Sequence, residues 1–116
     1  MSIFSLPADD LPSSLTHQDQ LWHQQLEEAI ARCFYESCDG VLQSLLMACD
    51  WHLSLTSGEL HLCLTCHDLS TNWRVLHNTR LLGRHLSRFT PNARILAQAD
   101  IEMGVPIDLN INELPG

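Results

Sequence analysis

The stretch CDWHLSLTSGELHLCLTC, residues 49–66, decides the fold, because apolar and polar side chains alternate along it on either side of Ser57 and Gly58. Alternation with a period of two is typical of a β-strand that buries one face. Glycine in a two-residue connection readily takes the positive φ that tight hairpin turns require. The stretch therefore predicts a β-hairpin that turns at these two residues.

A two-residue turn also fixes which residues of the two strands lie opposite each other. Leucines then face leucines, His52 faces Cys63, and Cys49 faces Cys66. Successive side chains of a strand point to opposite faces of the sheet. We therefore expect His52 and Cys63 on the polar face, and Cys49 and Cys66 on the core side.

Residues 63–67, CLTCH, match the Cys-x-x-Cys-His pattern that attaches haem in c-type cytochromes. Both thiols must reach one porphyrin edge, whereas the predicted strand points them to opposite faces. Covalent haem attachment also takes place outside the cytoplasm, and the N-terminal residues do not read as a secretory signal. We therefore expect no haem and no other cofactor.

Cys49-x-x-His52 and Cys63-x-x-Cys66 have the spacing of two zinc-ligand pairs. Four ligands must converge at about 2.0–2.3 Å from one ion, so a bulge or an early end of the strand near Cys66 would be needed to form such a site. His61 shares the polar face with His52 and Cys63, and we expect this trio to be ordinary strand residues. The weaker metal candidates are Cys49, His52, Cys63, Cys66 and His67.

An amphipathic helix is predicted from His17 onward, with Thr16 as its N-cap. Asp39 and Gly40 interrupt the pattern, so residues 17–49 form either one helix or two. The apolar residues at helical spacing, which we expect to face the core, are Trp22, Leu26, Ala29, Ile30 and Cys33.

Residues 70–89 return to helical spacing. Alternating runs at residues 93–99 and 105–111 predict a second hairpin, with its turn between Asp100 and Gly104. The predicted fold class is α+β: one or two N-terminal helices, then a hairpin, a helix and a hairpin. This order gives a four-stranded, mostly antiparallel sheet with helices on one face.

The chain has 116 residues, which suits one domain, and 45% of them are hydrophobic, close to the globular average. We expect residues 1–16 to be a flexible tail and residues 17–114 to form the domain. We expect no membrane insertion, because no apolar run is long enough, and we place the protein in the cytoplasm. The five cysteines should stay reduced there, with Cys33 and Cys49 as small buried hydrophobes.

The sequence lacks the common catalytic motifs. It has no Gly-rich phosphate loop, no GxSxG and no HExxH, and its carboxylates are dispersed rather than paired. We therefore expect a protein without enzymatic activity.

The basic residues are concentrated in one segment. All six are arginines, and five of them lie in residues 68–94, where Asp68 is the one acid, so this segment carries +4 in a chain of net charge −8. Spacings of three and four residues place basic side chains on one face of the predicted helix. This predicted basic stripe consists of Arg74, His77, Arg80, Arg84 and Arg88.

Arginine pairs well with carboxylates and phosphates. The acidic net charge and the lack of lysine weaken attraction to nucleic acid, so we favour an acidic protein surface as the ligand, with a homodimer as one form of it. The sequence thus predicts a protein-interaction module: an adaptor, assembly factor or regulatory subunit. A nucleic-acid-binding regulator that uses the same arginines is the alternative, and a metal or redox protein centred on CLTCH is the third interpretation.

Overall fold

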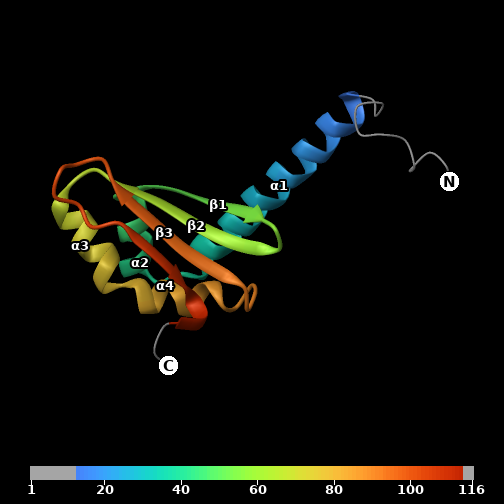
Figure 1. The fold of residues 1–116 in the computed structure, drawn as a ribbon. Coiled ribbons are helices and arrows are strands. Elements are labelled where there is room, and N and C mark those ends of the chain that lie inside the picture. The colour runs from blue at the N-terminus through green and yellow to red at the C-terminus, as the bar shows by residue number, and fades with distance from the viewer. Residues whose placement is uncertain (1–12, 114–116) are drawn as a thin grey trace.

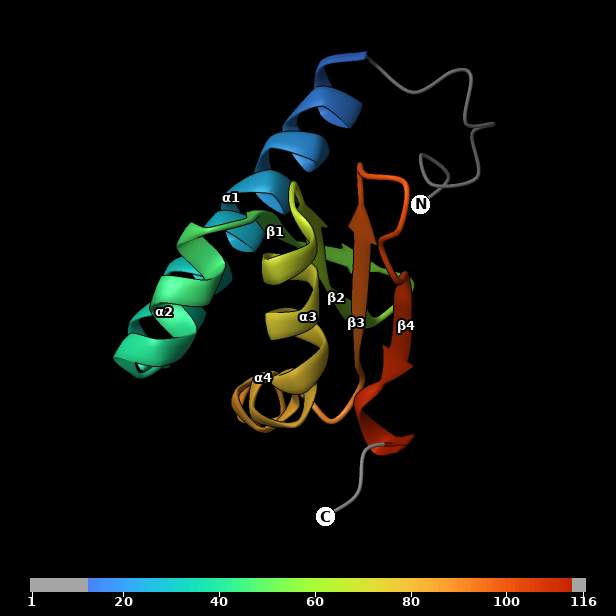
Figure 2. The ribbon, with the colours of Figure 1, turned by 90° about the vertical axis from the view of Figure 1, so that its left-hand side faces the viewer.

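The computed structural model describes residues 13–113, with side chains described from residue 18 onward. Within this range the chain forms a four-stranded sheet in the order β1-β2-β3-β4, with the helices on one side of it (Figure 2). The elements (Figure 1) are α1 (Ser13–Ser37), α2 (Gly40–Met47), β1 (Asp50–Thr56), β2 (Glu59–Cys66), α3 (Leu69–His77), α4 (Thr79–Leu86), β3 (Ala93–Ala99), β4 (Ile107–Asn110) and a short 3-10 turn (Ile111–Glu113).

The hairpin of β1 and β2 has the register that the sequence predicts. Thr56 lies opposite Glu59, and His52 lies opposite Cys63. Both turn residues have a positive φ, 52° for Ser57 and 81° for Gly58. This backbone is that of a type I′ turn, whose twist matches the twist of the two strands. Every second residue of β2 is buried, so one face of the hairpin belongs to the core.

The sheet is mixed, and not purely antiparallel. β3 and β4 form the predicted second antiparallel hairpin, but β2 and β3 are parallel, with Leu62 opposite Ile95. The reason is the connection between them. Two helices, α3 and α4, carry the chain back along the sheet, so that β3 starts in the same direction as β2.

The helix expected over residues 70–89 is in fact two helices that meet at Asn78. The Asn78 side chain donates a hydrogen bond to the Arg74 carbonyl at 2.7 Å, at the C-terminal end of α3. Figure 2 shows α4 running across the end of α3 rather than continuing it. This bend allows both helices to reach the core, where Val75 of α3 and Leu82 of α4 are fully buried.

α1 begins at Ser13, earlier than predicted, so Thr16 lies within the helix and is not its N-cap. Of the predicted tail, residues 13–16 are helical and residues 1–12 lie outside the described part of the chain, as do residues 114–116. In Figure 1 the N-terminal part of α1 extends beyond the sheet, whereas its C-terminal part lies against it.

The apolar stripe of α1 faces solvent for most of its length, which corrects the prediction that it faces the core. Its exposed members are Trp22 (74% exposed), Leu26 (49% exposed), Ala29 and Cys33. Ile30 alone among the predicted stripe packs against the core. The cause is that α1 contacts the body with a neighbouring face, which buries Phe34.

A separate helix, α2, follows, so residues 17–49 form two helices. Asp39 is its N-cap: the Asp39 Oδ1 accepts a hydrogen bond from the Leu42 N–H at 2.9 Å, which satisfies one of the free donors at the start of a helix. The buried face of α2 consists of Leu42, Leu45 and Leu46.

The core lies between the helix layer and the sheet. Leucine dominates it, and it draws on all four α-helices and all four strands. Its largest fully buried side chains are Phe34, Leu42, Leu45, Leu46, Leu60, Leu62, Leu64, Asn72, Val75, Leu82, Leu86 and Ile95.

The one polar member of this set, Asn72, ties α3 to the connection between β3 and β4. Its Nδ2 donates to the Val105 carbonyl at 3.0 Å, and its Oδ1 accepts from the Val105 N–H at 2.6 Å. Both ends of the buried amide are therefore hydrogen-bonded. The last loop of the sheet is thereby fastened to the helix layer.

We predict that Asn72→Ala lowers the free energy of unfolding by about 2 kcal/mol, because it removes two hydrogen bonds and leaves the Val105 backbone groups without a partner. Urea unfolding, followed by tryptophan fluorescence, measures the change. The matched control is Asn112→Ala at an exposed site, which should change stability by less than about 0.5 kcal/mol. Equal effects of the two substitutions would contradict the role of Asn72.

Candidate interaction surface

All five residues of the predicted basic stripe lie on or directly after α3 and α4, and all five are exposed. We call them the arginine surface: Arg74, His77, Arg80, Arg84 and Arg88. Because the helix bends at Asn78, they do not form one straight stripe. Two belong to the last turn of α3, two lie on α4, and the last follows α4.

In the part of the chain that the structure describes, the arginines of this surface form no ion pair. Among the described residues, no carboxylate lies within 4.0 Å of any of the four. Arg94 of β3 behaves differently, because its guanidinium is paired with Asp108 and lies 4.0 Å from Glu59. The guanidinium groups on α3 and α4 therefore remain available to an external anion.

Exposed apolar side chains accompany the arginines. Trp73 on α3 is 48% exposed, and its ring centroid lies 6.0 Å from that of His77. Leu81 on α4 and Phe89 after it are also partly exposed. Arginine and tryptophan are enriched at the energetic centres of protein interfaces. The sequence revealed the charge of this surface, but not the exposure of Trp73, which depends on how α3 packs.

The CLTCH segment lies where the hairpin register predicts. Cys49 and Cys66 are buried on the core face, whereas Cys63 is half-buried on the opposite face beside His52. The metal candidates are therefore divided between the two faces of the sheet. In residues 18–113, whose side chains the structure describes, no three His, Cys, Asp or Glu side chains are placed to hold a metal ion.

The thiols of this region are poor nucleophiles. Burial raises the pKa of the Cys49 thiol to about 12, and the neighbouring Cys66 thiol adds to the shift. Burial also raises the pKa of Cys63 and of Cys66. Because the thiolate is the reactive form, these shifts disfavour nucleophilic chemistry near neutral pH.

The histidine of CLTCH has a structural role. His67 Nδ1 lies 2.7 Å from Asp100 Oδ2, and His67 Nε2 lies 2.7 Å from Asp50 Oδ2. Both nitrogens can donate only in the imidazolium form, since neutral imidazole has one N–H. The hydrogen bond to Asp100 accordingly raises the pKa of His67 most, and the hydrogen bond to Asp50 raises it further. The cation joins the neighbouring ends of β1, β2 and β3.

We predict that His67 stabilises the fold in a pH-dependent way. Since its pKa is raised in the folded state, its contribution is complete below the unfolded value of about 6.5 and is lost as the pH rises through the folded value. Melting temperatures of wild type and His67→Ala, measured from about pH 5 to 9, should differ most at the acidic end and converge at the alkaline end. Gln98→Ala, at an exposed residue of β3 that carries no titratable group, is the control and should show no such trend. A difference that is constant with pH would contradict the stabilising role of the His67 imidazolium between Asp50 and Asp100.

We also predict an order of thiol reactivity. Alkylation of the folded protein by iodoacetamide at pH 8, followed by peptide mass spectrometry, should modify the exposed Cys33 first. Cys38, Cys49 and Cys66 should react only on unfolding, because burial removes access and raises the pKa of each thiol. Rapid modification of Cys66 in the folded protein would contradict its place in the core.

Two hollows flank this hairpin. One, of about 460 Å³, lies on the sheet face opposite the helices and is bordered by His52, Cys63 and Leu96. The other lies between α1 and the outer edge of β1, and its lining includes Glu27 and Glu28. Sequence analysis did not predict either hollow, because each joins residues from elements that are distant in the chain.

Comparison of the chain with protein-family models, with curated proteins and with solved structures finds no significant match. No helix in residues 13–113 is both long and apolar enough to cross a bilayer.

Proposed function

We propose that the protein is a non-enzymatic interaction module, an adaptor, assembly factor or regulatory subunit, whose arginine surface binds an acidic protein surface. The observation that carries this proposal is the absence of any carboxylate, among the described residues, within 4.0 Å of Arg74, Arg80, Arg84 or Arg88. Four cations on two short helices repel one another mildly, and an anionic partner would relieve that repulsion.

The partner is a protein because apolar side chains share this surface with the arginines. Trp73 and Leu81 expose apolar surface, and a ligand that contacts only the charges of the arginines would leave this surface in water. Burial of that area on binding is favourable at about 25 cal/mol per Å². Bidentate arginine–carboxylate pairs around it would set orientation and specificity.

A nucleic-acid ligand is the second candidate, and the half-exposed Trp73 beside His77 favours it, because aromatic rings stack on unpaired bases. The net charge of −8 weakens the long-range attraction on which nucleic-acid binding depends. A protein partner therefore remains the preferred ligand.

We predict that Arg80→Glu/Arg84→Glu/Arg88→Glu releases a partner that wild type retains when the tagged protein is purified from native lysate. Quantitative mass spectrometry identifies the proteins, and absorbance at the nucleic-acid wavelength detects the alternative ligand. All three side chains are exposed, so the variant should keep the wild-type circular dichroism spectrum.

A single-charge comparison sharpens this test. Arg84→Glu should lower the affinity for the partner about tenfold, because it removes one charge-assisted contact and adds a repulsive charge. Arg32→Glu makes the same change at an exposed site of α1 and should leave binding intact. If the triple variant keeps every partner, the proposal is wrong. A steep loss of binding with salt, together with co-purified nucleic acid, would instead establish the second candidate.

A further inference from the structure

The outer edge of β1 is partly occupied by side chains of α1. β1 is an edge strand of the sheet. The Leu55 N–H donates to Glu27 Oε2 at 2.7 Å, and His23 Nε2 donates to the Leu55 carbonyl at 2.8 Å. Both backbone groups of Leu55 therefore point away from β2, and two α1 side chains bind them as an added strand would. This contact satisfies the backbone groups of one residue in the edge strand.

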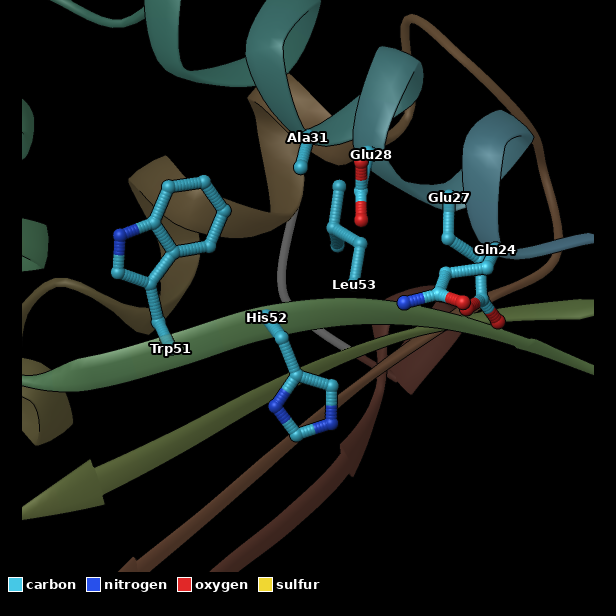
Figure 3. Close-up of a pocket in the computed structure, with 7 residues that line it drawn as sticks. All are labelled: Gln24, Glu27, Glu28, Ala31, Trp51, His52 and Leu53. Carbon is cyan, nitrogen blue, oxygen red and sulfur yellow. The ribbon is translucent and has the colours of Figure 1, made fainter. Parts of the chain in front are cut away.

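The next positions along this edge have no backbone partner among the described residues. Backbone groups of alternate residues in an edge strand point to the same side, so those of Leu53 and Trp51 share the orientation of Leu55. No described residue forms a hydrogen bond with them. They border a groove of about 360 Å³ between α1 and β1. Figure 3 shows Trp51 at one end of the groove, Gln24 and Glu27 toward the other, and α1 lying over Leu53.

The walls of the groove are acidic and aromatic. Glu27 and Glu28 project from α1, and no arginine lines the groove. Glu28 forms no ion pair with any described residue, whereas Glu27 is held by Leu55 and His23. At the end of the groove the Trp51 indole is stacked on a neighbouring tyrosine ring, which fixes its position. A carboxylate next to a fixed indole suits a cationic side chain.

We propose that this groove binds an extended, basic segment of a partner protein as an additional strand on the edge of β1. Main-chain hydrogen bonds to Leu53 and Trp51 supply the pairing, and a basic side chain of the segment meets Glu28, with Trp51 alongside. A second copy of this chain is a poor occupant, because Glu27 and Glu28 of its own α1 flank its β1 and would meet the same carboxylates of the first copy. The site is separate from the arginine surface and opposite to it in charge.

The test uses the full-length, ¹⁵N-labelled protein and fluorescein-labelled octapeptides. The first peptide alternates arginine and valine, and the second alternates glutamate and valine. Two further versions of the first peptide carry N-methyl groups on either the arginine or the valine amides. In an added strand only one of these two sets of N–H groups faces β1. One methylated peptide should therefore bind like the parent, and the other should not bind.

The arginine peptide should shift the amide signals of Trp51 and Leu53 and the indole signal of Trp51. Glu28→Arg should weaken its binding about tenfold, and Glu28→Gln should weaken it less. Glu36→Arg makes the same charge change at an exposed α1 residue outside the groove, and it should leave the affinity within about twofold.

Any of four results would overturn the proposal: no binding of the arginine peptide at millimolar concentration, equal effects of the two methylation patterns, equal binding of the glutamate peptide at this groove, or signal shifts confined to α3 and α4. The proposed function of the arginine surface is tested by other residues, so either proposal can fail while the other stands.

Discussion

The rest of the structure depends on the two-residue turn at Ser57 and Gly58. Because side chains alternate along a strand, a change of one residue in that turn would move every leucine of β2 to the opposite face. With the observed turn, Leu62 and Cys66 are fully buried, and Cys63 faces away from the helices. Cys63 and Cys66 lie on opposite faces because they are three residues apart in one strand, and the turn determines that Cys66 is the buried one. The metal candidates fail to converge for the same reason.

The helices contact the sheet in two different ways. α3 and α4 cross from β2 to β3 and turn their apolar sides into the core, which leaves their arginines in solvent. α1 instead reaches the outer edge of β1 through His23 and Glu27. The molecule therefore has a basic surface on α3 and α4 and an acidic groove between α1 and β1. Such separation of charge allows two partners of opposite charge to be distinguished.

The sequence predicted most of the architecture because strong periodic patterns determined it. The two hairpins follow from alternation with a period of two, and the concentration of basic residues is read directly from the sequence. Predictions failed where packing overrode pattern. Trp22 and Leu26 have helical spacing but are exposed, because α1 contacts the body through a neighbouring face. The 70–89 region kept its helical spacing across Asn78, so periodicity alone could not reveal the bend.

By itself, therefore, the sequence determined the strand register, the faces of the cysteines and the concentration of arginine in one segment, since each depends on local alternation or composition. Only the tertiary structure decided that β2 and β3 are parallel, that His67 lies between Asp50 and Asp100, and that Glu27 reaches the backbone of Leu55. These contacts join residues that are distant in the chain, and their geometry depends on how complete elements pack. Local pattern carries no information about that packing.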